Sequence, residues 1–103
     1  RTGYDKHLED NKPHIPEELP HLTKDAAEFL EQLQNIRVVG IDSITVDQPG
    51  KQDAHHALKD RLIVESLVYL HEIPVTEFDL QTSPVKIEGA TGGPVIAYAF
   101  IKK

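Results

Sequence analysis

The 103-residue sequence contains no cysteine, so it offers neither a disulfide framework nor a thiolate metal site. It also has no apolar stretch near the roughly 20 residues that a membrane-spanning helix needs. Its formal charge is −6 and its basic residues are scattered, which argues against binding to nucleic acid or to an anionic membrane. We therefore expect a cytoplasmic protein whose partners are small molecules or other proteins.

Methionine is absent too, and the sequence begins at Arg1. We therefore expect that the chain is part of a longer protein. We predict an extended, proline-rich segment at residues 1–22. We predict that residues 23–103 are the α/β C-terminal portion of one domain. His7, His14 and His21 recur every seven positions, but the prolines between them forbid a continuous helix. A structural metal site built from these three histidines is a separate hypothesis.

The pattern after residue 22 alternates helical and strand signals. Thr23 is the predicted N-cap of a helix that runs to about residue 34 with an apolar stripe formed by Ala26, Ala27, Phe29, Leu30 and Leu33. Residues 36–42 and 62–70 predict strands, the first of them buried, on either side of a short helix at 53–60. Residues 81–88 and 94–101 predict a hairpin joined by a glycine-rich turn. The fold class is therefore α/β, a mixed sheet of about four strands with flanking helices.

Two adjacent histidines begin the segment DAHHALKDRLIVES at residues 53–66. In a helix, His55 shares a face with Leu58, whereas His56 points away, so His55 is the predicted inward histidine. A core histidine that binds a backbone carbonyl would satisfy the same pattern.

Glu65 lies within the apolar run LIVESLVYL and is predicted to be buried. A buried carboxylate needs a proton, a basic partner or a metal, because burial without one costs several kcal/mol. Arg61 is one candidate partner. A metal shared with His55 is the other, since imidazole and carboxylate are both metal ligands. Ser43 and Ser66 lack the context of a nucleophilic serine, and GATGG lacks the lysine of a phosphate-binding loop.

Six segments resemble, in order, the C-terminal half of the cyclase family of metal-dependent hydrolases, which includes bacterial kynurenine formamidase and isatin hydrolase. They are RTGYD at 1–5, KDAAEFL at 24–30, VVGIDSITVD at 38–47, HHAL at 55–58, LIVESLVYL at 62–70 and SPVKIEGATGGPVIAYA at 83–99. The resemblance implies a swivelling β/β/α cyclase-like fold. It also implies that His55 and Glu65 are metal ligands, with Zn²⁺ or Mn²⁺ as the metal. Ser66 stands where the family has asparagine, and the interval between the two ligands is shorter than in the family.

The family motif H-x-G-T-H-x-D-x-P-x-H, which supplies the other ligands and the proton-transferring histidine, does not occur in the sequence. We therefore expect it in an N-terminal half outside this chain, which carries no catalytic residue of its own. The resemblance implies a formamidase-like hydrolase of small amide substrates that forms a homodimer or a larger homo-oligomer. The alternative is a non-catalytic binding or assembly domain with the same fold.

Overall fold

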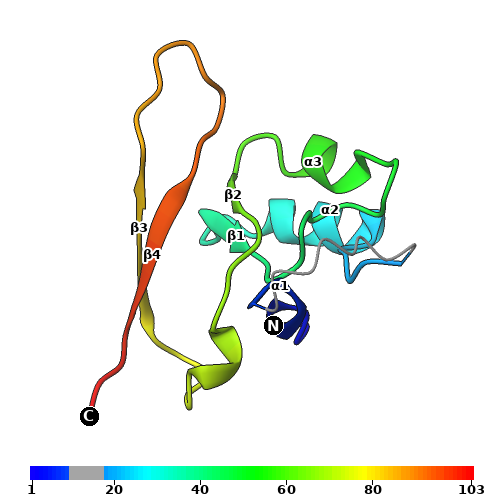
Figure 1. Cartoon of the computed structure of the whole chain (residues 1–103). Coiled ribbons are helices and arrows are strands. Elements are labelled where there is room, and N and C mark those ends of the chain that lie inside the picture. The colour runs from blue at the N-terminus through cyan, green and yellow to red at the C-terminus, as the bar shows by residue number, and fades with distance from the viewer. Residues whose placement is uncertain (10–17) are drawn as a thin grey trace. The chain divides into compact units, whose positions relative to one another are not determined.

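The computed structural model describes residues 1–9 and 18–103, which form two compact units, residues 1–71 and 72–103 (Figure 1). It contains both helices and strands, which confirms the α/β class. The predicted single mixed sheet is wrong for the described residues: β1 and β2 form a parallel pair, and β3 and β4 form a separate antiparallel pair. The elements in order are α1 (Asp5–Glu9), α2 (Lys24–Gln32), β1 (Val38–Gly40), α3 (Asp53–Ala57), β2 (Leu62–Val64), the 3₁₀ turn η1 (Leu70–Glu72), β3 (Asp79–Pro84) and β4 (Val95–Phe100).

Helix α2 begins where the sequence predicts. The Thr23 side chain accepts a hydrogen bond of 3.2 Å from the N–H of Ala26, which would otherwise have no intrahelical partner. The predicted apolar stripe is only partly buried: Ala27 is inaccessible to solvent, whereas Phe29 remains 59% exposed. No helix within residues 1–9 and 18–103 is long and apolar enough to cross a membrane.

Strands β1 and β2 are shorter than predicted. The residues predicted to be buried in β1 are buried only after the strand has ended. The two strands pair Val38 with Leu62 and Gly40 with Val64. Their residues are mostly exposed or half-buried, while Ile41 and the two residues that follow it are buried. The pairing continues irregularly, because the N–H of Ile41 donates to the carbonyl of Val64 over 2.9 Å. This contact keeps the segment after β1 beside the segment after β2.

The core of the first unit lies between α2, α3 and the loop that follows β1. Helix α2 packs against α3, and the buried side chains come from both helices and from this loop. Leu58 and Val46 are the largest side chains that are completely buried. The fully buried or nearly buried members are Ala27, Ile41, Val46, Ala54 and Leu58. Loop residues 41–47 therefore form part of the core, and this fixes the position of the polar groups beside them.

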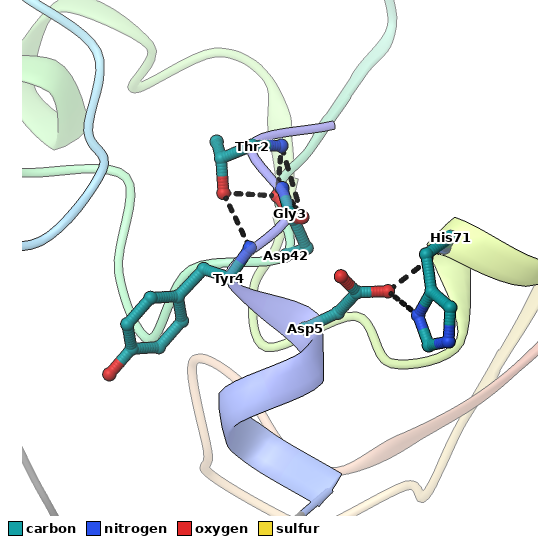
Figure 2. Close-up of polar contacts among 6 residues, drawn as sticks. All are labelled: Thr2, Gly3, Tyr4, Asp5, Asp42 and His71. Carbon is teal, nitrogen blue, oxygen red and sulfur yellow. Dashed lines mark hydrogen bonds and ion pairs between the residues drawn. The ribbon is translucent and has the colours of Figure 1, made fainter.

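Within the first unit, buried carboxylates connect the N-terminal residues to later segments of the chain (Figure 2). Asp42 accepts hydrogen bonds of 2.8 Å from the backbone N–H groups of Thr2 and Gly3, and one of 2.9 Å from the Thr2 hydroxyl. Residues 5–9 form α1 rather than the irregular chain that the prolines nearby predict. Helix α1 starts at Asp5, which is itself buried and hydrogen-bonded to His71.

The second unit is the predicted β-hairpin. Strands β3 and β4 pair in antiparallel register from Asp79 with Phe100 to Pro84 with Val95. The connection contains a turn in which the N–H of Ala90 donates to the carbonyl of Ile87 over 3.2 Å. Gly89 takes a φ of 74° inside this turn, a conformation that residues with a Cβ rarely adopt. Gly89 of the GATGG segment therefore acts as a turn residue, as predicted, whereas Gly92 and Gly93 take no positive φ.

Candidate functional site

Helix α3 receives its N-terminal capping interaction from an aspartate outside the helix. The flanking residue Gln52 makes no side-chain cap. Instead, the buried carboxylate of Asp47 accepts a hydrogen bond of 2.6 Å from the N–H of Ala54 and a longer one of 3.4 Å from that of His55. These are orphan donors of the first helical turn, which a capping side chain normally satisfies. Asp47 therefore fixes where α3 begins.

The same carboxylate binds the His55 imidazole through its Nδ1 atom. Burial alone would raise the pKa of the Asp47 carboxyl. The hydrogen bonds from the His55 side chain and from the backbone N–H of Ala54 outweigh burial and lower that pKa below its ordinary value. Asp47 is therefore a negatively charged acceptor at neutral pH.

Glu65 approaches His55 from the other side. It follows the last residue of β2, and its Oε1 atom lies 3.6 Å from Nε2 of His55. The same oxygen accepts a hydrogen bond of 2.9 Å from the N–H of Val46, the residue before Asp47. The loop after β1 thus positions both carboxylates. Its residue Val46 holds the Glu65 carboxylate through a backbone N–H, and its residue Asp47 provides the second carboxylate. The structure brings together the two residues that the sequence predicts as metal ligands.

The burial predicted for these two residues is only partly correct. The His55 side chain is 43% exposed, and the buried positions of α3 and its C-cap are Ala54 and Leu58. Glu65 is 30% exposed, because β2 ends at Val64 and Ser66 turns the chain with a φ of 55°. Both side chains lie at the edge of the core, where polar atoms can reach solvent.

The predicted alternative, an ion pair between Glu65 and Arg61, is wrong. Arg61 Nε lies 3.3 Å from a carboxylate oxygen of Glu31, and Arg61 Nη2 donates to the Glu31 carbonyl over 2.7 Å. Within the described ranges, neither Asp47 nor Glu65 has a lysine or arginine within ion-pair distance. The His55 imidazole therefore lies between two carboxyl groups, neither of which pairs with a lysine or arginine of the described ranges.

This donor set fits part of the coordination shell of a divalent ion. Two nitrogen or oxygen ligands of a tetrahedral zinc ion lie about 3.4 Å apart, given metal–ligand bonds of about 2.1 Å. The separation of 3.6 Å between His55 Nε2 and Glu65 Oε1 is close to that value. No cluster of three or more histidine, aspartate or glutamate side chains that could hold a metal occurs in the described part of the chain. Further ligands would therefore have to come from other residues.

The three N-terminal histidines are not tested as a site, because His14 lies outside the described residues. The His21 ring donates from Nδ1 to the carbonyl of Leu19 over 2.7 Å. His7 packs its ring near that of Tyr4, with ring centres 5.4 Å apart. The hypothesis of a metal site at these histidines stays a prediction.

Sequence reasoning missed Asp47, Asp42 and Asp5, all of which are buried. The capping preference for aspartate is a signal only when the residue directly precedes a helix. Asp47 is separated from α3 by the loop QPGKQ, so no local pattern marks its role. Asp42 and Asp5 bind residues far away in the sequence, which no local pattern can reveal.

No protein-family model and no solved structure matches the chain. Among curated proteins, it is 34% identical over 86 residues to a kynurenine formamidase of Bacillus cereus, covering 81% of this chain and 41% of that protein. A kynurenine formamidase of Bacillus anthracis is 33% identical over the same length. That of Sphingopyxis alaskensis is 34% identical over 93 residues, covering 79% of this chain and 44% of that protein.

The chain therefore spans less than half of the length of the curated relatives it matches. The matched region covers 81% of this chain. A region of that size must include His55 and Glu65 wherever it begins. The resemblance drawn from the sequence is confirmed: the chain is similar, over about four fifths of its length, to bacterial kynurenine formamidases.

Proposed function

We propose that the protein hydrolyses the amide bond of a small formamide-like substrate with the help of a divalent metal ion, Zn²⁺ or Mn²⁺. The single observation that supports this most strongly is the facing pair His55 and Glu65, whose Nε2 and Oε1 atoms lie 3.6 Å apart in a chain similar to kynurenine formamidases. When bound at such a pair, a divalent ion lowers the pKa of a bound water and polarises a carbonyl group.

The residues of this chain have holding and orienting roles in the proposal. His55 offers the Nε2 lone pair, because its Nδ1 atom is engaged by Asp47. Glu65 offers a carboxylate oxygen that the N–H of Val46 holds in place. The remaining ligands and the group that transfers the proton lie outside the described residues. Small-molecule amides are the proposed substrates, because the similar proteins are kynurenine formamidases. The chain alone is proposed to be inactive, because it lacks the remaining ligands.

The test is amide hydrolysis by the full-length protein. Hydrolysis of an aryl formamide should be lost after chelation and restored by Zn²⁺ or Mn²⁺. We expect Glu65→Gln to lower kcat/KM by at least about 100-fold, because outer partners of metal ligands already cost 10–100-fold when removed. Glu77→Gln, a change at an exposed glutamate of the second unit, is the matched control. Undiminished activity after chelation, or in Glu65→Gln, contradicts the proposal.

A non-catalytic binding or assembly domain is the second candidate. One observation favours it: Ile96, Tyr98 and Phe100 lie on one face of β4, and each is more than half exposed. Large apolar side chains grouped on a surface are typical of interaction sites. A full-length protein that binds no divalent metal and hydrolyses no formamide would support this candidate. A homodimer or larger homo-oligomer, in a cytoplasmic location, is compatible with either function.

A further inference from the structure

Asp47 uses both of its carboxylate oxygens on the segment that carries His55. Oδ1 accepts from the N–H of Ala54 over 2.6 Å, and Oδ2 contacts both the backbone N–H and the ring Nδ1 of His55. Asp47 is 3% exposed, so its carboxylate is held almost entirely by protein groups. An ionised carboxylate only accepts hydrogen bonds, so the His55 ring must carry its proton on Nδ1.

We propose that Asp47 is a positioning residue that selects the tautomer and the ring orientation of His55, so that Nε2 presents a lone pair towards Glu65. This inference rests on the proposed metal-dependent function, and it assigns a role to a residue that holds no ligand itself. A histidine that binds a metal commonly donates its other N–H to a carboxylate, which fixes its tautomer and raises its basicity as a ligand. Asp47 is placed for that role.

In the alternative arrangement, the His55 ring is protonated on both nitrogens. The distance from Nε2 to Glu65 fits this arrangement less well than it fits a proton on Nδ1 alone. A proton on Nε2 would donate a hydrogen bond to Glu65, and such bonds are about 2.7–3.2 Å long. The separation of Nε2 from Oε1 of Glu65 is 3.6 Å, which is too long for such a bond, whereas Nδ1 is hydrogen-bonded to Asp47. The asymmetry of the two contacts places the proton on the Asp47 side.

Replacing the carboxylate with an amide should reverse the tautomer. In Asp47→Asn, the amide oxygen can still accept from the N–H of Ala54, which keeps the capping interaction. The amide N–H₂ group then faces Nδ1 of His55, which can accept this bond only by giving up its proton. Turning the amide over would instead set its N–H₂ group against the N–H of Ala54. The proton therefore moves to Nε2, and Nε2 loses its metal-binding lone pair.

The measurement is ¹⁵N NMR of the His55 side chain in the metal-free full-length protein, at a pH where the spectrum itself shows a neutral ring. We expect the Nδ1–H tautomer in the wild type and the Nε2–H tautomer in Asp47→Asn. Affinity for Zn²⁺ should fall by about 10–100-fold in Asp47→Asn. Asp42→Asn is the matched control, because Asp42 is an equally buried aspartate that binds backbone N–H groups of Thr2 and Gly3. It should leave both the tautomer and the affinity unchanged.

A wild-type protein with the Nε2–H tautomer overturns the role of Asp47, and so does an Asp47→Asn variant with unchanged tautomer and Zn²⁺ affinity. If that variant does not fold, the wild-type spectrum alone decides. The two proposals fail differently. Formamide hydrolysis together with the Nε2–H tautomer removes the role of Asp47 and leaves the function. The Nδ1–H tautomer in a protein that binds neither Zn²⁺ nor Mn²⁺ removes the proposed function and with it the metal-related role.

Discussion

The Asp5 carboxylate accepts two hydrogen bonds from His71, one of 3.0 Å from its backbone N–H and one of 2.9 Å from Nδ1 of its ring (Figure 2). The two residues lie 66 positions apart in the sequence. They connect the first residue of α1 to η1, so the N-terminal segment is joined to the end of the first unit. We expect this connection to make the stability of that unit depend on pH.

Burial would raise the pKa of Asp5, but the hydrogen bonds and the charge interaction with His71 outweigh it and lower that pKa below its ordinary value of 3.8. A carboxyl whose folded pKa is lowered stabilises the fold above its unfolded pKa and ceases to do so as the pH falls through the folded value. We expect Asp5→Asn to reduce the free energy of unfolding by about 2 kcal/mol at pH 7, the scale of hydrogen bonds to charged groups.

Urea unfolding of Asp5→Asn and wild type at pH 7 and at about pH 2 checks this prediction, because the difference should shrink in acid. Asp60→Asn, at an exposed aspartate, should change stability little at either pH. A difference between Asp5→Asn and wild type that stays constant down to the lower pH would show that the charge of Asp5 contributes nothing.

Ser66, directly after Glu65, adopts a φ of 55°. This left-handed conformation costs a residue with a Cβ roughly 1–2 kcal/mol, and asparagine tolerates it better than most. We expect Ser66→Asn and Ser66→Gly to raise the free energy of unfolding by about 0.5–1 kcal/mol. Thermal unfolding measures this, with Ser83→Asn in strand β3 as the control that should be neutral or destabilising. A loss of stability in both Ser66 variants would contradict the strain.

Leu58 follows α3 as its C-cap and is completely buried in the core that supports His55. Leu58→Ala should cost about 2–5 kcal/mol, because it removes buried apolar area and leaves a cavity. Leu62→Ala is the matched control, since Leu62 is 68% exposed in β2 and buries little surface. Denaturant midpoints compare the two variants. Equal effects would mean that the first unit is not packed around Leu58.

The exposed row on β4 leads to a prediction about assembly. If Ile96, Tyr98 and Phe100 form a contact between two copies of the protein, Tyr98→Glu should lower the mass measured by light scattering. Ala97→Glu introduces the same charge on the opposite face of the same strand and should leave the mass unchanged. A monomeric wild type, or an equal effect of both substitutions, would rule out this contact.

The sequence predicted those features that depend on neighbours along the chain. The Thr23 cap of α2, the helix that carries His55 and the β-hairpin were recovered, because capping, helical periodicity and turn residues are local signals. A metal shared by His55 and Glu65 was one alternative that the residues left open, and the family resemblance favoured it. The structure places Nε2 of His55 3.6 Å from Oε1 of Glu65.

What the sequence did not predict depends on contacts between distant segments. The apolar run after residue 61 reads as one long strand, but the bonds of Ser66 and Leu67 to the segment after β1 end β2 early. Asp47 reaches the first turn of α3 across a loop. Arg61 pairs with Glu31 rather than with Glu65, although Glu65 is nearer in the sequence. Each outcome is decided by tertiary geometry, which hydrophobic periodicity does not encode.

The most direct test of the account is the position of zinc in crystals of the full-length protein, measured by anomalous scattering at the zinc absorption edge. The account predicts a zinc peak about 2.0–2.2 Å from both Nε2 of His55 and a carboxylate oxygen of Glu65. The peak should disappear in His55→Gln and persist in His56→Gln, which changes the neighbouring exposed histidine of α3. A zinc peak elsewhere in the protein, with none between His55 and Glu65, would contradict it.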